Sequence, residues 1–148
     1  MEMNKDILEH LRGGSFTSSF KFRYERGSKN DVCTRFLYIR DRILGKRVIH
    51  LGCVDHTVKK AMEKREENMW MHDYITQHAS RCLGVDIAEE AVREVSREMD
   101  VDNIIAGDIT GPPLEAITQS AWEYMVLAEV LEHIDNPVSF LQAIRENY

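Results

Sequence analysis

The sequence predicts an α/β fold in which helices cover both faces of a mostly parallel β-sheet. Short apolar runs alternate along the chain with longer segments of helical periodicity, which is the pattern of repeated strand–helix units. The apolar runs do not alternate between apolar and polar residues, so each strand is expected to be buried on both faces. The 148 residues fit a single domain, 1–148, with a lead-in and helix over 1–44 and the α/β core over 45–148.

The first two elements are a helix and a strand. Apolar side chains recur at helical spacing over 31–44, and Gly45 stands where a helix would end. The segment 47–52 is a short, β-branched apolar run that ends in glycine, which predicts a buried strand.

A long connection separates this strand from the next one. The charged stretch 56–68 leads into 69–75, which we interpret as the rest of a helix. The resulting distance from Gly52 to Asp86 exceeds the about 20 residues expected of a compact βαβ unit. We therefore interpret 57–68 as a charged insertion and a candidate mobile lid.

The remaining elements continue the alternation of strands and helices. Apolar residues lie on one face of the segment 88–99, which predicts an amphipathic helix. The last helix opens at Asn136 and Pro137, a residue pair typical of a helix N-terminus. The other predicted elements are strands over 81–86, 103–108 and 122–128 and one or two helical turns over 114–119.

Composition excludes several functional classes. The net charge of −6 argues against binding to nucleic acid phosphates. The sequence contains no apolar run of bilayer length and no secretory signal, so we expect a cytoplasmic protein without membrane contact. The three cysteines have neither disulfide nor zinc spacing, and we expect no metal and buried, reduced thiols.

Candidate site residues stand at the strand ends, because open parallel sheets bind ligands beyond the carboxyl ends of their strands. Gly52 would let a ligand approach the backbone closely, although a simple turn also explains it. Asp86 could accept the two hydroxyls of a ribose, or instead cap the following helix. Asp108 could accept from an adenine amino group, or instead stabilise a turn.

Four runs together resemble the successive motifs of class I S-adenosylmethionine-dependent methyltransferases. The most similar branch is the small-molecule, methyltransferase type 11-like one, whose fourth motif reads "evLEHi.np". The resemblance covers about 45–148 and implies S-adenosylmethionine as cofactor and S-adenosylhomocysteine as product. It also implies a three-layer, Rossmann-like methyltransferase fold. The runs are His50-Leu-Gly-Cys53, Gly84-Val-Asp-Ile87, Gly107-Asp-Ile109 and the segment from Val126 to Pro137.

The resemblance assigns eight residues to the cofactor. Gly52 and Cys53 would line the methionine portion, Asp86 would hold the ribose diol, Ile87 would pack on adenine with Asp108 and Ile109 at its edge, and Ala128 and Glu129 would lie near the sulfonium. By position alone, Trp70 and His72 are candidates to close over the pocket.

His133 is the candidate general base, because it follows the fourth strand and histidine is the residue type most often used for proton transfer. A turn histidine bonded to the backbone is the alternative interpretation. The chain also departs from the family pattern. His50 replaces an acidic residue at the end of the first strand, and Val54 and His56 replace glycines.

These observations predict a methyltransferase that acts on a small-molecule or glycan-precursor acceptor. A non-catalytic cofactor-binding or assembly module is the alternative. A nicotinamide dinucleotide protein would share the role of Asp86, but the sequence lacks GxGxxG. The family fold has seven strands and this sequence supplies four, so we expect a domain that lacks its last strands. The uncovered strand edge predicts a homodimer.

Overall fold

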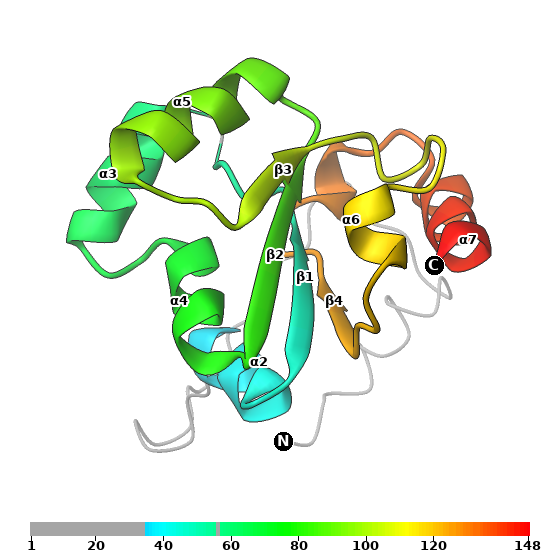
Figure 1. Ribbon diagram of the computed structural model, residues 1–148, viewed down its shortest axis with the longest axis horizontal. Helices are drawn as coiled ribbons and strands as arrows, with labels where there is room; N and C mark the ends of the chain where they lie inside the picture. The colour runs from blue at the N-terminus through cyan, green and yellow to red at the C-terminus, as the bar shows by residue number, and fades with distance from the viewer. Residues whose placement is uncertain (1–34, 56) are drawn as a thin grey trace, which may run out of the picture. The chain divides into compact units, whose positions relative to one another are not determined.

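The computed structural model describes residues 35–55 and 57–148, which all belong to one compact unit (Figure 1). The lead-in and the first residues of the predicted helix 31–44 lie outside this part of the chain. The described elements are α2 (Arg35–Ile43), β1 (Arg47–Leu51), α3 (Val58–Glu66), α4 (Met71–His78), β2 (Arg81–Asp86), α5 (Glu89–Met99), β3 (Ile104–Ala106), α6 (Glu115–Thr118), β4 (Tyr124–Val126), the 3₁₀ turn η2 (Leu131–His133) and α7 (Pro137–Asn147).

The four strands form one sheet in the order β3-β2-β1-β4, and every pair of neighbours is parallel. This confirms the predicted α/β class with a parallel sheet. β1 is central, and its residue His50 lies in register between Gly84 of β2 and Val126 of β4. The chain turns outward from β1 to β2 and β3, and then returns to the opposite side of β1 with β4. The strand order therefore reverses direction between β1 and β4.

Helices cover both faces of the sheet, as the continuous apolar strands predict (Figure 1). Val48 packs against α2 and α4 on one face, and Ile49 packs against α6 and α7 on the other. β1 is buried from Val48 to Leu51 because both of its faces are covered. His50 shares the face of Val48, because alternate residues of a strand point the same way.

The segment 57–75 does not form the single helix that the sequence predicts, and a mobile lid over 57–68 stays a prediction. Two helices replace it, α3 and α4, and the chain between them passes through Asn68 in the left-handed region at φ 56°. α3 packs on α5 through Ala61, which is fully buried in one cluster with Val92 and Val95. The short side chain of Ala61 fits this interface, whereas the charged side chains around it obscured the apolar period in the sequence.

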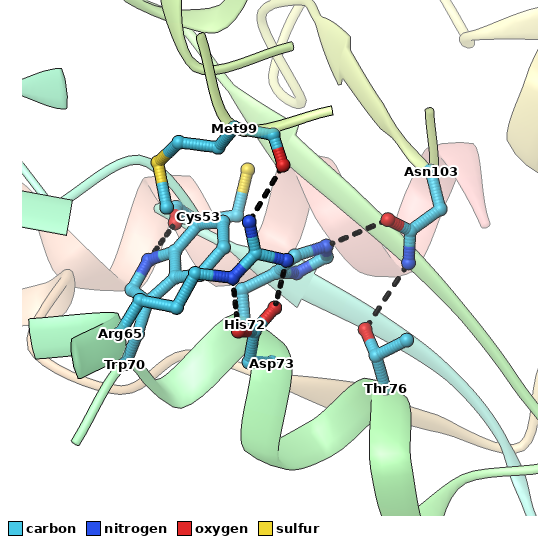
Figure 2. A network of polar contacts seen from close by, with 8 residues as sticks. All are labelled: Cys53, Arg65, Trp70, His72, Asp73, Thr76, Met99 and Asn103. Atoms are coloured by element: carbon cyan, nitrogen blue, oxygen red, sulfur yellow. Dashed lines mark hydrogen bonds and ion pairs between the residues drawn. The ribbon is translucent and has the colours of Figure 1, made fainter. Parts of the chain in front are cut away.

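Arg65 ties α3 to two other helices (Figure 2). Its guanidinium donates to the Asp73 carboxylate in α4 at 2.7 Å and to the carbonyl of Met99, the last residue of α5, at 2.6 Å. A cation that satisfies the last carbonyls of a helix is a favourable C-terminal interaction. The charged segment is therefore part of the packed helical layer.

β3 and β4 are shorter than the predicted strands 103–108 and 122–128. Each of them pairs with a single neighbour, over three residues. The other boundaries agree closely with the sequence. Gly45, at φ 69°, follows α2, and the Asn136 side chain caps α7 by accepting from the backbone N–H of Ser139 at 3.1 Å.

Across the described helices, none combines the length and the apolar character that a membrane span requires. The structure also shows two of the three cysteines, Cys53 and Cys82, as buried thiols without a disulfide. This agrees with the expectation of reduced thiols, while Cys33 lies outside the described residues.

Candidate functional site

A pocket of about 560 Å³ lies beyond the carboxyl ends of β1, β2 and β4. Its position is the point at which the strand order reverses, where open α/β sheets bind their ligands. Its volume is within the range of small-molecule sites. Seven of the nine predicted site residues line it, namely Gly52, Cys53, Asp86, Ile87, Ala128, Glu129 and His133.

Gly52 forms the turn that leaves β1. Its φ of 69° is in the left-handed region, and a Cβ at this position would lie 2.7 Å from Cγ2 of Val130. Its backbone N–H donates to the carbonyl of Val85 at 2.9 Å, which extends the ladder to β2. Glycine is therefore required so that the segment after β4 can approach the end of β1.

Asp86 joins the two loops that frame the pocket. One carboxylate oxygen accepts from the backbone N–H of Val54 at 3.1 Å, and the other accepts from Ala88 at 3.0 Å. The contact with Ala88 places the carboxylate at the start of α5, because Ala88 immediately precedes this helix. Each carboxylate oxygen has a second lone pair, so the fixed carboxylate can still accept from a ligand. Beside it, Ile87 leaves 74% of its surface exposed.

Asp108 and Ile109 do not line the pocket. β3 ends at Ala106, and the backbone N–H of Gly107 still donates to the carbonyl of Asp86 at 2.9 Å, so Asp108 is the first residue beyond the contact with β2. The Asp108 carboxylate accepts from the backbone N–H and hydroxyl of Thr110, which lowers its pKa. Ile109 is buried in the core below α6 and α7. The turn interpretation of Asp108 therefore describes its geometry.

The segment after β4 brings Ala128, Glu129 and His133 to the pocket. Glu129 has a φ of 62° and forms an ion pair with Arg35 at the pocket rim. Asp55, on the opposite loop, has the same φ of 62° and pairs with Lys64. Left-handed backbone costs on the order of 1–2 kcal/mol per non-glycine residue and tends to gather at functional sites. His133 lines the pocket from η2.

Trp70 forms part of the pocket wall, whereas His72 does not line the pocket. The Trp70 indole N–H donates to the carbonyl of Cys53 at 3.1 Å, as Figure 2 shows, and the ring is 2% exposed. Trp70 is therefore a fixed wall and not a closing element. His72 is fully buried beneath the pocket. Burial raises the pKa of the Cys53 thiol, so Cys53 contributes a neutral packing group.

His50 is a pocket residue that the sequence reasoning treated only as a departure from the family pattern. It is 2% exposed and still lines the pocket. Burial, and to a lesser extent the neighbouring His72, lower the pKa of His50 to about 3. His50 is thus neutral at physiological pH. Its position within an apolar, fully buried strand was the signal that could have identified it, because buried polar groups require partners.

No protein family, curated protein or solved structure significantly matches the chain. The geometry of the site therefore carries the functional argument. Within the ranges 35–55 and 57–148, no cluster of three or more His, Cys, Asp or Glu side chains could hold a metal ion.

Proposed function

We propose that this protein binds S-adenosylmethionine in the strand-end pocket and transfers its methyl group to a small-molecule acceptor. The observation that carries the proposal is the convergence of three strand ends on one pocket. Gly52 after β1, Asp86 at the end of β2 and Glu129 after β4 are distant in sequence and line the same cavity. They are also the positions at which the family resemblance places cofactor contacts.

The topology supports this proposal. The strand order β3-β2-β1-β4 is the same as the first part of the order found in Rossmann-type folds, in which ligands occupy the crevice at the reversal. A three-layer, Rossmann-like methyltransferase fold is the interpretation that we favour for this α/β sheet.

The residues present fit an adenosyl group. The Asp86 carboxylate is held by two backbone N–H groups, and among the described residues no lysine or arginine forms a salt bridge with it. It can therefore accept hydroxyl groups, as an acidic residue does for a ribose in dinucleotide sites. The exposed side chain of Ile87 offers an apolar surface for a flat base.

When it is bound, S-adenosylmethionine supplies an electrophilic methyl group on a sulfonium. An in-line displacement gains most from positioning and from exclusion of water, and both are functions of the pocket walls. Trp70, anchored to Cys53, fixes one wall. We assign His133 the role of general base, which would accept a proton from the acceptor.

One observation favours a non-catalytic cofactor-binding module as the second candidate. Val54 occupies a position where the resembling family has glycine, and its side chain is 1% exposed in the core under α3 and α5. The loop after β1 is therefore held by packing at this point, which limits how closely its backbone approaches a ligand. Turnover with an acceptor distinguishes the two candidates, because both require cofactor binding.

Isothermal titration calorimetry tests the proposal. We expect S-adenosylmethionine and S-adenosylhomocysteine to bind and NAD not to bind. Asp86→Asn removes the charge from the proposed ribose acceptor. Since a charge-assisted hydrogen bond contributes about 1.5–3 kcal/mol, we expect a loss of affinity of about tenfold or more.

Asp108→Asn is the matched control, because Asp108 also accepts backbone hydrogen bonds but lies outside the pocket. Its affinity should equal that of the wild type. Thermal unfolding of both variants checks that each is folded at the titration temperature. Binding of NAD without binding of S-adenosylmethionine and S-adenosylhomocysteine would contradict the proposal. Equal affinities of Asp86→Asn and the wild type for S-adenosylmethionine would also contradict it.

A further inference from the structure

A chain of hydrogen bonds runs from the pocket through two buried histidines to the half-buried Asn103. His50 and His72 stack with their rings 5.5 Å apart and 11° from parallel, and their Nδ1 atoms are 3.3 Å from each other. His72 continues to Asn103, whose Oδ1 is 3.2 Å from Nε2 of His72. Figure 2 shows the Asn103 amide between the His72 ring and Thr76.

The orientation of the Asn103 amide is fixed by its second contact. The Nδ2 group donates to the backbone carbonyl of Cys82 at 3.3 Å and to the Thr76 hydroxyl at 3.1 Å. A carbonyl can only accept, so the reverse orientation would place two oxygens against each other. Oδ1 therefore faces His72, and Nε2 of His72 must carry the proton.

This orientation determines the protonation of both rings. Burial lowers the pKa of His72 and of His50, so both rings are neutral and each carries one N–H. His72 uses its proton on Nε2, and its Nδ1 is an acceptor. The contact between the two Nδ1 atoms then places the proton of His50 on Nδ1, because two facing lone pairs would repel each other. The Cys82 thiol also lies near Nδ1 of His72, at the longer distance of 3.9 Å. Nε2 of His50 is left with a lone pair.

Nε2 is the ring nitrogen of His50 for which the described part of the chain provides no hydrogen bond, because His50 makes its bond through Nδ1. Every fully buried side-chain nitrogen or oxygen in this part of the chain has a hydrogen-bond partner, so Nε2 is not fully buried. His50 lines the pocket, and Nε2 is therefore the ring nitrogen that is available to a bound ligand.

We propose that His50 presents the lone pair of Nε2 to the pocket as a fixed hydrogen-bond acceptor, so that the ligand group bound there is an N–H or O–H donor. The Asn103–His72 pair positions His50 by fixing its tautomer. A hydroxyl or an ammonium group fits this position, and a carboxylate or ether oxygen does not. Only the identity of the ligand rests on the proposed function, and the tautomers of His50 and His72 do not.

Imidazole ¹⁵N NMR of the ligand-free protein near neutral pH tests the tautomers. We expect a protonated Nδ1 and an unprotonated Nε2 in His50, and the reverse in His72; His50→Gln identifies the His50 signals. His72→Phe keeps a stacked ring but removes the acceptor, so His50 should lose its single tautomer. The control His78→Phe, on the same helix, should leave His50 unchanged. A His50 with its proton on Nε2, or with two protons, overturns the inference.

Two ligands then distinguish the donor. S-adenosylhomocysteine carries an ammonium group, and methylthioadenosine has the same nucleoside without it. A change in the His50 Nε2 shift with the first ligand alone identifies the ammonium as donor, and a change with both identifies a donor of the shared nucleoside, which is a ribose hydroxyl or the adenine amino group. Binding of both without any change overturns the acceptor role. If neither binds, the proposed function fails, and the ligand-free spectrum still decides the tautomer.

Discussion

Burial keeps His50 and His72 neutral, and this couples the stability of the fold to pH. In the unfolded chain both histidines would titrate near the ordinary value of about 6.5. In the folded protein burial lowers both pKa values, to about 3 for His50. The stabilisation is therefore complete above about pH 6.5, and it is lost as the pH falls toward the folded-state values, because only the unfolded state takes up protons.

Urea unfolding between about pH 6 and about pH 5 measures this coupling. A group that is protonated only in the unfolded state changes the unfolding free energy by about 1.4 kcal/mol per pH unit, so we expect a loss of about 1 kcal/mol from His50 and a further loss in the same direction from His72. The double variant His50→Gln, His72→Gln should lose this part of the slope, and His78→Gln should keep it. Equal slopes for the wild type and the double variant would show that the pair is not buried as neutral rings.

At this scale, the sequence predicted some site residues and missed others for physical reasons. Gly52 and Asp86 end strands whose boundaries the apolar runs define, so their convergence followed from the parallel sheet. Asp108 lies two residues beyond β3, because the strand ends with its apolar residues at Ala106 and the predicted strand 103–108 was too long. His50 was missed because its environment depends on His72, which comes from a different element.

At the scale of the elements, Gly84 allows α4 to lie close to β2. A Cβ on Gly84 would lie 2.7 Å from Cε1 of His72 and 2.8 Å from both Sγ of Cys53 and Cγ2 of Ile104. The ring of His72 therefore lies directly over the strand, at the level of His50 in the neighbouring β1. Glycine in the middle of a strand often marks such a close approach.

Gly84→Ala should accordingly destabilise the fold by about 1–3 kcal/mol, the usual cost of overpacking a core. Gly111→Ala is the control, because its Cβ would meet nothing closer than 3.4 Å. Urea unfolding gives both values. If the two variants had the same stability, α4 would not lie against β2 as closely as the structure indicates.

The packing of α3 gives a second prediction at this scale. Ala61 is fully buried against α5, and the adjacent Met62 is 42% exposed. Ala61→Lys and Met62→Lys add the same charge one residue apart. We expect the first to lower the unfolding free energy by more than about 2 kcal/mol and the second by less than about 0.5 kcal/mol. Similar small effects would support the interpretation of 57–68 as a loosely attached lid.

The elements with a strong apolar pattern were predicted well, and the others were not. α5 has apolar residues on one face, and its predicted range 88–99 is close to Glu89–Met99. α3 presents a single buried residue, Ala61, so charge dominates its sequence. The break at Asn68 depends on a backbone conformation that the periodicity of the neighbouring residues does not encode.

At the scale of the whole molecule, the sheet order brings three loops together around one pocket. β1 has neighbours on both sides, and the loops after β1, β2 and β4 surround the pocket. β3 and β4 are the edge strands of the described sheet. The homodimer expected from an open strand edge stays a prediction, which sedimentation at several protein concentrations tests.

A second cavity makes the location of the ligand testable. It lies on the α6 and α7 side of the sheet, and its lining includes Trp122, Met125 and Tyr148. None of its lining residues also lines the strand-end pocket. A ligand in this cavity would contact none of Gly52, Asp86 and Glu129. A ligand in one cavity would therefore change the NMR signals of a different set of residues from a ligand in the other.

Amide chemical-shift mapping with S-adenosylhomocysteine shows which cavity the ligand occupies. We expect the largest changes at Gly52, Asp86, Ile87 and Glu129, while Trp122 and Tyr148 stay unperturbed. Changes concentrated around Trp122 and Tyr148, or no changes at a large excess of ligand, would contradict this expectation.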